Sequence, residues 1–200
     1  MIVVQCFRWV SRQWLIFGKK LLVTTQYKNE NVNKGVRMEK YLEMLKEGGA
    51  IAAIEIDPAT VVTAPWVVFK CQFGCNRYGT SRVCPPRTPT YQHMREILDS
   101  FNRAILFSCP SLTAVKPLAV DIAKEIFFDG FYRVITLGAG PCLLCKECDL
   151  DKCRNPQKAI PAMESCGIDV FATARAHGFQ ISTLRERGEP VINFGLILVD

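Results

Sequence analysis

The sequence predicts an α/β fold, in which a mixed, largely parallel sheet has flanking helices and two cysteine-rich loops at strand ends. Short apolar runs alternate along the chain with segments whose apolar residues recur at helical spacing. Glycine and proline punctuate the boundaries between these segments. Alternation of this kind favours a sheet with helices packed on it, and each cysteine group comes directly after a predicted strand.

The predicted strands are short apolar runs bounded by turn-forming residues. The first of them ends at Asp57-Pro58, and the fourth feeds into the second cysteine group through a glycine-rich turn. In chain order the predicted strands cover residues 50–56, 66–69, 104–107, 132–137 and 191–199.

The predicted helices carry apolar residues every three or four positions and have recognisable ends. Thr88-Pro89 is typical of a helix start, with a capping hydroxyl followed by a first-turn proline. Asp169 predicts another N-cap, and Gly167 predicts the end of a short helix just before it. In chain order the helical patterns cover residues 38–47, 88–101, 118–127, a short turn before Gly167, and 170–177.

Charge divides the chain into a basic extension, residues 1–37, and one cysteine-rich α/β domain, residues 38–200. The extension holds seven basic residues and one acidic residue, so it accounts for the whole formal charge of +6. The rest of the chain is neutral, and we therefore predict no nucleic-acid surface on the domain. We expect the extension to be either a disordered segment or the product of a mis-assigned start, with translation beginning at Met38.

No apolar run in the sequence has the length of a membrane span, and no secretory signal is recognisable. The expected location is therefore the reducing cytoplasm. Cysteines there bind metal or take part in redox chemistry more often than they form structural disulfides. The sequence does not indicate an oligomeric state.

The second cysteine group is the stronger metal-binding signal. Cys142, Cys145, Cys148 and Cys153 have the spacing C-x2-C-x2-C-x4-C, which is similar to a ferredoxin run but has one extra residue before the last cysteine. Three thiols in consecutive x2 steps suit an iron–sulfur cluster, which we expect to be of the 4Fe–4S type, better than zinc, which prefers paired C-x2-C knuckles. Zinc remains the alternative cofactor.

The first cysteine group has three members, Cys71, Cys75 and Cys84, with the spacing C-x3-C-x8-C and two prolines after the last. A cubane cluster takes four ligands, so a fourth must come from elsewhere or the site has an open position. Cys153 or Cys166 is able to complete it, whereas Cys109 is expected to be a buried apolar side chain. The predicted ligands are Cys71, Cys75, Cys84, Cys142, Cys145, Cys148, Cys153 and Cys166.

Three motifs together resemble an uncharacterised family of "predicted metal-binding proteins" found mainly in anaerobic prokaryotes. These are the first cysteine group with Pro85-Pro86, the second group with Arg154 and Pro156, and Met163-Glu164-x2-Gly167-Ile168-Asp169-Val170. The resemblance spans roughly residues 38–200. It implies metal binding by the cysteines and residence in the cytoplasm, but it implies no particular reaction.

Three functions are compatible with these features. The favoured one is an iron–sulfur protein, with one or two clusters, that transfers electrons to a redox partner protein in anaerobic metabolism. The second is a redox enzyme whose open-coordination cluster acts on a small substrate. The third is a zinc-binding structural or adaptor protein.

Overall fold

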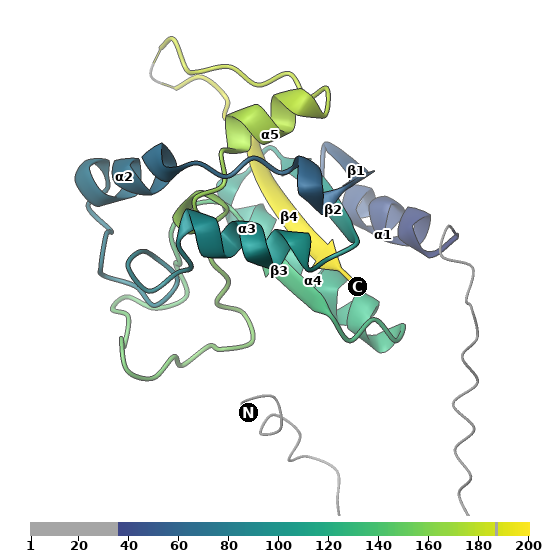
Figure 1. Ribbon diagram of the computed structural model, residues 1–200, viewed down its shortest axis with the longest axis horizontal. Coiled ribbons are helices and arrows are strands. Elements are labelled where there is room, and N and C mark those ends of the chain that lie inside the picture. The colour runs from purple at the N-terminus through teal and green to yellow at the C-terminus, as the bar shows by residue number, and fades with distance from the viewer. Residues whose placement is uncertain (1–35, 187) are drawn as a thin grey trace, which may run out of the picture. The chain divides into compact units, whose positions relative to one another are not determined.

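The computed structural model describes residues 36–186 and 188–200, with side chains from Met38 onward, so nearly all of the predicted extension lies outside the described residues. Helices and strands are interspersed along the described chain, with two successive α-helices between the first and second strands (Figure 1). In chain order they are α1 Val36–Glu47, β1 Ala52–Ile56, the 3-10 turn η1 Pro58–Thr60, α2 Pro65–Gly74, α3 Tyr91–Asp99, β2 Arg103–Cys109, α4 Leu112–Phe128, β3 Val134–Leu137, the 3-10 turn η2 Glu164–Cys166, α5 Val170–Ala176 and β4 Asn193–Val199.

The described residues form one sheet of four strands in the order β1-β2-β4-β3, and every neighbouring pair is antiparallel. The predicted largely parallel sheet is therefore wrong. The reason for the wrong prediction is visible in β2, where all residues but the first are buried. Layers on both sides bury a strand completely, which gives the continuous apolar run that is typical of parallel sheets.

Helices cover both faces of the sheet. Side chains of α1 and α4 pack in one core cluster against Ile105 and Phe107 of β2. Side chains of α3, η2 and α5 pack in a second cluster against Ala104 and Leu106 of the same strand. Because alternate residues of a strand point to opposite faces, one buried strand serves both clusters.

The predicted strand 66–69 is wrong, because these residues lie in helix α2. The helix has Pro65 in its first turn after the extended residue Ala64, and a short apolar run alone does not distinguish a strand from a helix. The helix predicted from Thr88 exists as α3, but its N-cap is Thr90, whose hydroxyl accepts a hydrogen bond from the backbone of His93 at 3.2 Å. The predicted caps at Gly167 and Asp169 are confirmed.

The segment that carries the second cysteine group leaves the sheet at the end of β3. The carboxyl ends of β2 and β3 lie at the same edge as the start of β4. The chain after β3 continues past this edge, where Gly138 pairs with Ala162 just before η2. None of the helices in the described part of the chain is long and apolar enough to cross a membrane.

Candidate metal centres

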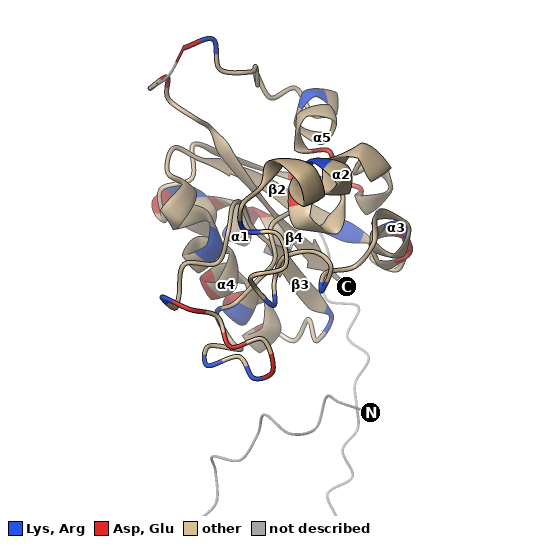
Figure 2. Cartoon of the chain, turned by 90° about the vertical axis from the view of Figure 1, so that its left-hand side faces the viewer, with Lys and Arg blue, Asp and Glu red and all other residues tan. Residues whose placement is uncertain are grey.

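The second cysteine group lies on the segment after β3, as predicted, and this segment contains neither helix nor strand between Pro141 and Ile160. All four of its cysteines are half-buried and line one small cavity. Asp149 shapes the turn between the third and fourth cysteines, because its carboxylate accepts hydrogen bonds from the backbone of Lys152 at 2.9 Å and of Asp151 at 3.0 Å. The same two N–H groups hold the pKa of that carboxyl below its usual range. The segment contains charged residues of both signs, which Figure 2 colours blue and red along the ribbon.

Two sulfur atoms of this group accept hydrogen bonds from one residue. The side-chain amide of Asn155 donates to Cys145 Sγ at 3.2 Å, and its backbone N–H donates to Cys153 Sγ at 3.4 Å. N–H donors around cysteine sulfurs stabilise metal-bound thiolates and tune the potential of iron–sulfur clusters. Asn155 was not among the predicted site residues, although it lies between Arg154 and Pro156, which belong to the second of the three motifs.

The first cysteine group is held by a helix and a closed turn. Cys71 is in α2, Cys75 is the exposed C-cap of that helix, and half-buried Cys84 follows a turn. The backbone N–H of Gly79, at a φ of 72°, donates to Pro85 O at 2.9 Å and so closes the turn. The prediction that both cysteine groups follow strand ends is therefore wrong for this group, since Cys71 lies inside a helix.

Electrostatic interactions indicate that the three cysteines of the first group are neighbours. Burial raises the pKa of the Cys71 thiol, and negative charge on Cys75, Glu164 and Cys84 raises it further. Burial also raises the pKa of Cys84, which the Lys116 ammonium opposes. Thiols with raised pKa values remain protonated near neutral pH, so a metal ion has to displace their protons.

Cys166 lies next to the first group but in a different environment. It is fully buried in η2, within the core cluster that contains Met163 and Ile168. Burial raises its pKa to about 12, and charge on Glu164, Cys71 and Cys84 adds to the increase. Cys166 therefore lies close enough to the first group to interact electrostatically with Cys71 and Cys84. Its role as a ligand stays a prediction. Cys109 is fully buried in the other core cluster, as expected of an apolar side chain.

A direct link joins the two groups. The guanidinium of Arg82, between Cys75 and Cys84, donates to the carbonyl of Leu150 at 2.9 Å and also to that of Asp151. These carbonyls lie between Cys148 and Cys153. The turn of the first group is thus fastened to the loop of the second.

Two charged residues beside the cysteines were missed in the sequence. Lys116 of α4 is partly buried, and its ammonium donates to Gly140 O at 2.8 Å. Burial lowers its pKa, whereas negative charge on Cys142, Cys84, Glu164 and Cys166 holds it up. The Glu164 carboxyl has a pKa raised by burial, and its Oε2 atom is inaccessible and has no hydrogen-bond partner. A lysine within the apolar stripe of α4 and a glutamate beside core Met163 were the available signals.

None of the nine described cysteines forms a disulfide. Within residues 38–186 and 188–200, no three Cys, His, Asp or Glu side chains lie close enough together to hold a single metal ion. The donor set nevertheless fits a thiolate-bound group at the second centre, because four half-buried sulfurs line one cavity and two of them already have N–H donors. The eight predicted ligands stay a prediction.

Comparison with known proteins agrees with this chemistry. No curated protein and no solved structure matches the chain. A family described as "Predicted metal-binding protein (DUF2284)" matches residues 54–199, a range that contains all eight predicted ligands and the whole sheet except the first two residues of β1. The chain belongs to this family of predicted metal-binding proteins.

Proposed function

We propose that this protein binds iron–sulfur clusters, of the 4Fe–4S type, at its two cysteine groups and transfers electrons to a partner protein in the cytoplasm during anaerobic metabolism. The observation that carries the proposal is the second group, where four cysteines line one cavity and Asn155 donates to two of the sulfurs. A bound cluster supplies one-electron redox chemistry there. The family assignment supports metal binding, and the cysteine spacing supports iron and sulfide.

The surroundings of the cysteines favour an anionic group. A thiolate-bound cluster carries negative charge, and Lys116 places a partly buried ammonium close to Cys142 and Cys84. Asn155 adds N–H donors on the other side of the second group. These contacts stabilise thiolates and the reduced state, so the residues present fit an electron-carrying centre.

The exposure of both groups favours exchange of electrons with another protein. Cys75 is exposed and the cysteines of the second group are half-buried, so both centres lie near the surface. Residues 58–95 contain no acidic residue, and Arg77, Arg82 and Arg87 are exposed among them. A basic surface next to a redox centre attracts an acidic partner and raises the rate of encounter.

The proposal is tested by purifying the full chain without oxygen and measuring iron, acid-labile sulfide and zinc. We expect iron and sulfide in near-equal amounts, little zinc, and an electron paramagnetic resonance signal after reduction with dithionite. Zinc without sulfide would instead identify a zinc-binding structural or adaptor protein.

One cysteine variant tests the second centre, and another serves as its control. Cys145→Ser should lose the iron and sulfide of one centre, because it removes one of the four sulfurs that line the cavity, the one that Asn155 contacts through its side chain. The matched control is Cys109→Ala, at a cysteine buried in the core, which should keep the full metal content and lose only stability. Full metal content in Cys145→Ser would show that the second group is assigned incorrectly.

A further inference from the structure

A cavity of about 500 Å³ opens beside the first cysteine group. It is bounded by α2, by the segment from Glu164 to Phe171 and by the residues that precede β4, and most of its lining is apolar. Cys71 and Cys75 form part of the wall. Volumes of 300–1,000 Å³, apolar walls and a few polar groups are typical of sites for small organic ligands.

One carboxyl oxygen in this cavity lacks a hydrogen-bond partner. Glu164 lines the cavity, and its Oε2 atom is inaccessible to water and accepts no hydrogen bond. The Lys116 ammonium attracts the Glu164 carboxylate electrostatically, but its hydrogen bond goes to Gly140 O. A buried carboxylate oxygen without a donor is costly, so a donor bound in the cavity would stabilise it.

The other charged groups of the lining are already engaged. The Asp169 carboxylate caps α5 by accepting from the backbone of Ala172 at 2.9 Å. Lys70 is exposed, and its ammonium lies 5.3 Å from the ring centre of Trp66. The remaining polar lining is neutral apart from the two cysteines, so Glu164 is the carboxylate left for a ligand.

We propose that this cavity binds a small organic amine, whose ammonium pairs with Glu164 while its apolar body lies along Trp66 and Ile168. An ammonium supplies the donors that Oε2 lacks. That this amine lies next to a metal centre rests on the function proposed above. The binding of the amine itself does not depend on that function.

Trp66 provides a fluorescent reporter in the cavity wall. The chain has three tryptophans, and replacing the other two, Trp9→Phe and Trp14→Phe, leaves Trp66 alone in the full-length protein. The probes are benzylamine, neutral benzyl alcohol and anionic benzoate, which share one ring. We expect saturable change with benzylamine, binding at least about tenfold weaker for benzyl alcohol, and no saturation with benzoate.

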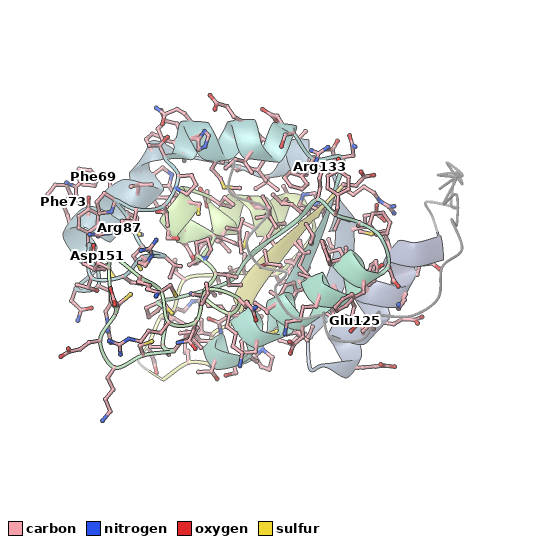
Figure 3. All side chains as sticks on the ribbon, turned by 90° about the horizontal axis from the view of Figure 1, so that it is seen from below. Phe69, Phe73, Arg87, Glu125, Arg133 and Asp151 are labelled. Atoms are coloured by element: carbon pink, nitrogen blue, oxygen red, sulfur yellow. The ribbon has the colours of Figure 1, made fainter. Side chains whose placement is uncertain are left out.

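The test variant is Glu164→Gln, which keeps the size of the side chain and removes its charge. It should weaken benzylamine at least about tenfold and leave benzyl alcohol unchanged. The control is Glu125→Gln, an exposed carboxylate on α4 that Figure 3 shows far from α2, and it should change nothing.

Equal affinity for the three probes in the unsubstituted protein would overturn the proposal without any variant. So would unchanged benzylamine binding in Glu164→Gln. The metal content of each sample separates the two proposals. If Glu164→Gln loses metal but binds benzylamine normally, Glu164 is a metal ligand and the amine site is wrong. If the protein contains no iron yet binds benzylamine through Glu164, the amine site stands and the iron–sulfur function fails.

Discussion

The two cysteine groups are supported differently. The first depends on helix α2 and on a turn closed by backbone hydrogen bonds, and it lies beside the buried charges of Glu164 and Lys116. The second lies on a segment without helix or strand, whose local order comes from Asp149, Asn155 and the link to Arg82. Backbone hydrogen bonds hold the first group whether or not a metal is present, whereas the second has few contacts of its own. A bound metal should therefore matter more for the structure of the second group.

Removing the metal is the strongest test of this contrast. We expect chelation to loosen the second group, because metal binding is coupled to folding there. Trypsin should then cut after exposed Lys146, Lys152 and Arg154 much faster than before, while Lys70 in α2 stays protected. Mass spectrometry of the early fragments measures this order. Simultaneous cleavage at Lys70 and Lys146 would mean that both groups depend equally on metal.

A glycine substitution should damage the first group alone. Gly167 has a φ of 80°, and an added Cβ would lie 2.5 Å from Tyr91 Cβ and 2.9 Å from its Cα. Its carbonyl also accepts from Ala64 N at 2.8 Å, at the start of α2. We expect Gly167→Ala to lower the free energy of unfolding by about 3 kcal/mol, from left-handed strain and overpacking.

Gly178 is the matched control, because it has the same φ of 80° and open space around its Cβ position. Gly178→Ala should lower the free energy of unfolding by only about 1 kcal/mol. Urea unfolding compares the two variants, and metal analysis should find the second centre still filled in Gly167→Ala. Equal losses in the two variants would exclude the contact with Tyr91 as the cause.

Alkaline pH should destabilise the metal-free protein through Cys166. Its thiol has an ordinary pKa of 9.0 in the unfolded chain and about 12 in the fold. Below pH 9 the Cys166 thiol keeps its proton in both the folded and the unfolded state, so the stability that the neutral buried thiol allows is fully present. Between pH 9 and 12 the unfolded chain releases a proton that the folded chain retains, so stability falls by about 1.4 kcal/mol per pH unit. Cys166→Ala should flatten the slope in urea titrations, and an unchanged slope would refute this.

The smallest expected effect concerns Lys116, which is close to cysteines of both groups. Lys116→Met removes a positive charge, so the reduced and more anionic state of a nearby cluster loses stabilisation. The reduction potential should fall by on the order of tens of millivolts, and Lys116→Arg should restore most of it. Redox titration measures the shift. A rise in potential would show that burial of the ammonium, rather than its charge, dominates.

Most elements of the fold were predictable because they depend on local signals. Gly167 ends a helical turn and Asp169 begins the next helix, as expected, and the strand 104–107 lies within β2. The pairing of the strands was not predictable, because it depends on contacts between distant residues. A strand such as β2 has an almost continuous apolar sequence whether its neighbours are parallel or antiparallel, provided that both faces of the sheet are covered.

The sites were predictable only in part. Cysteine spacing predicts the two groups, because ligands of one metal centre are often close together in sequence, and their role as ligands stays a prediction. It did not identify Lys116, Glu164 or Asn155, because a buried ammonium or carboxylate looks like any other charged residue until its neighbours are known. The helix under Cys71 was also missed, since its apolar run suited either kind of element.

The position of β4 has a consequence for how the domain matures. This strand is the last one in chain order, yet it lies between β2 and β3, which pair with it rather than with each other. During synthesis both cysteine groups leave the ribosome before the residues that close the sheet. The nascent chain therefore exposes its cysteines before the core is complete, and we expect metal to be inserted only after β4 has joined the sheet.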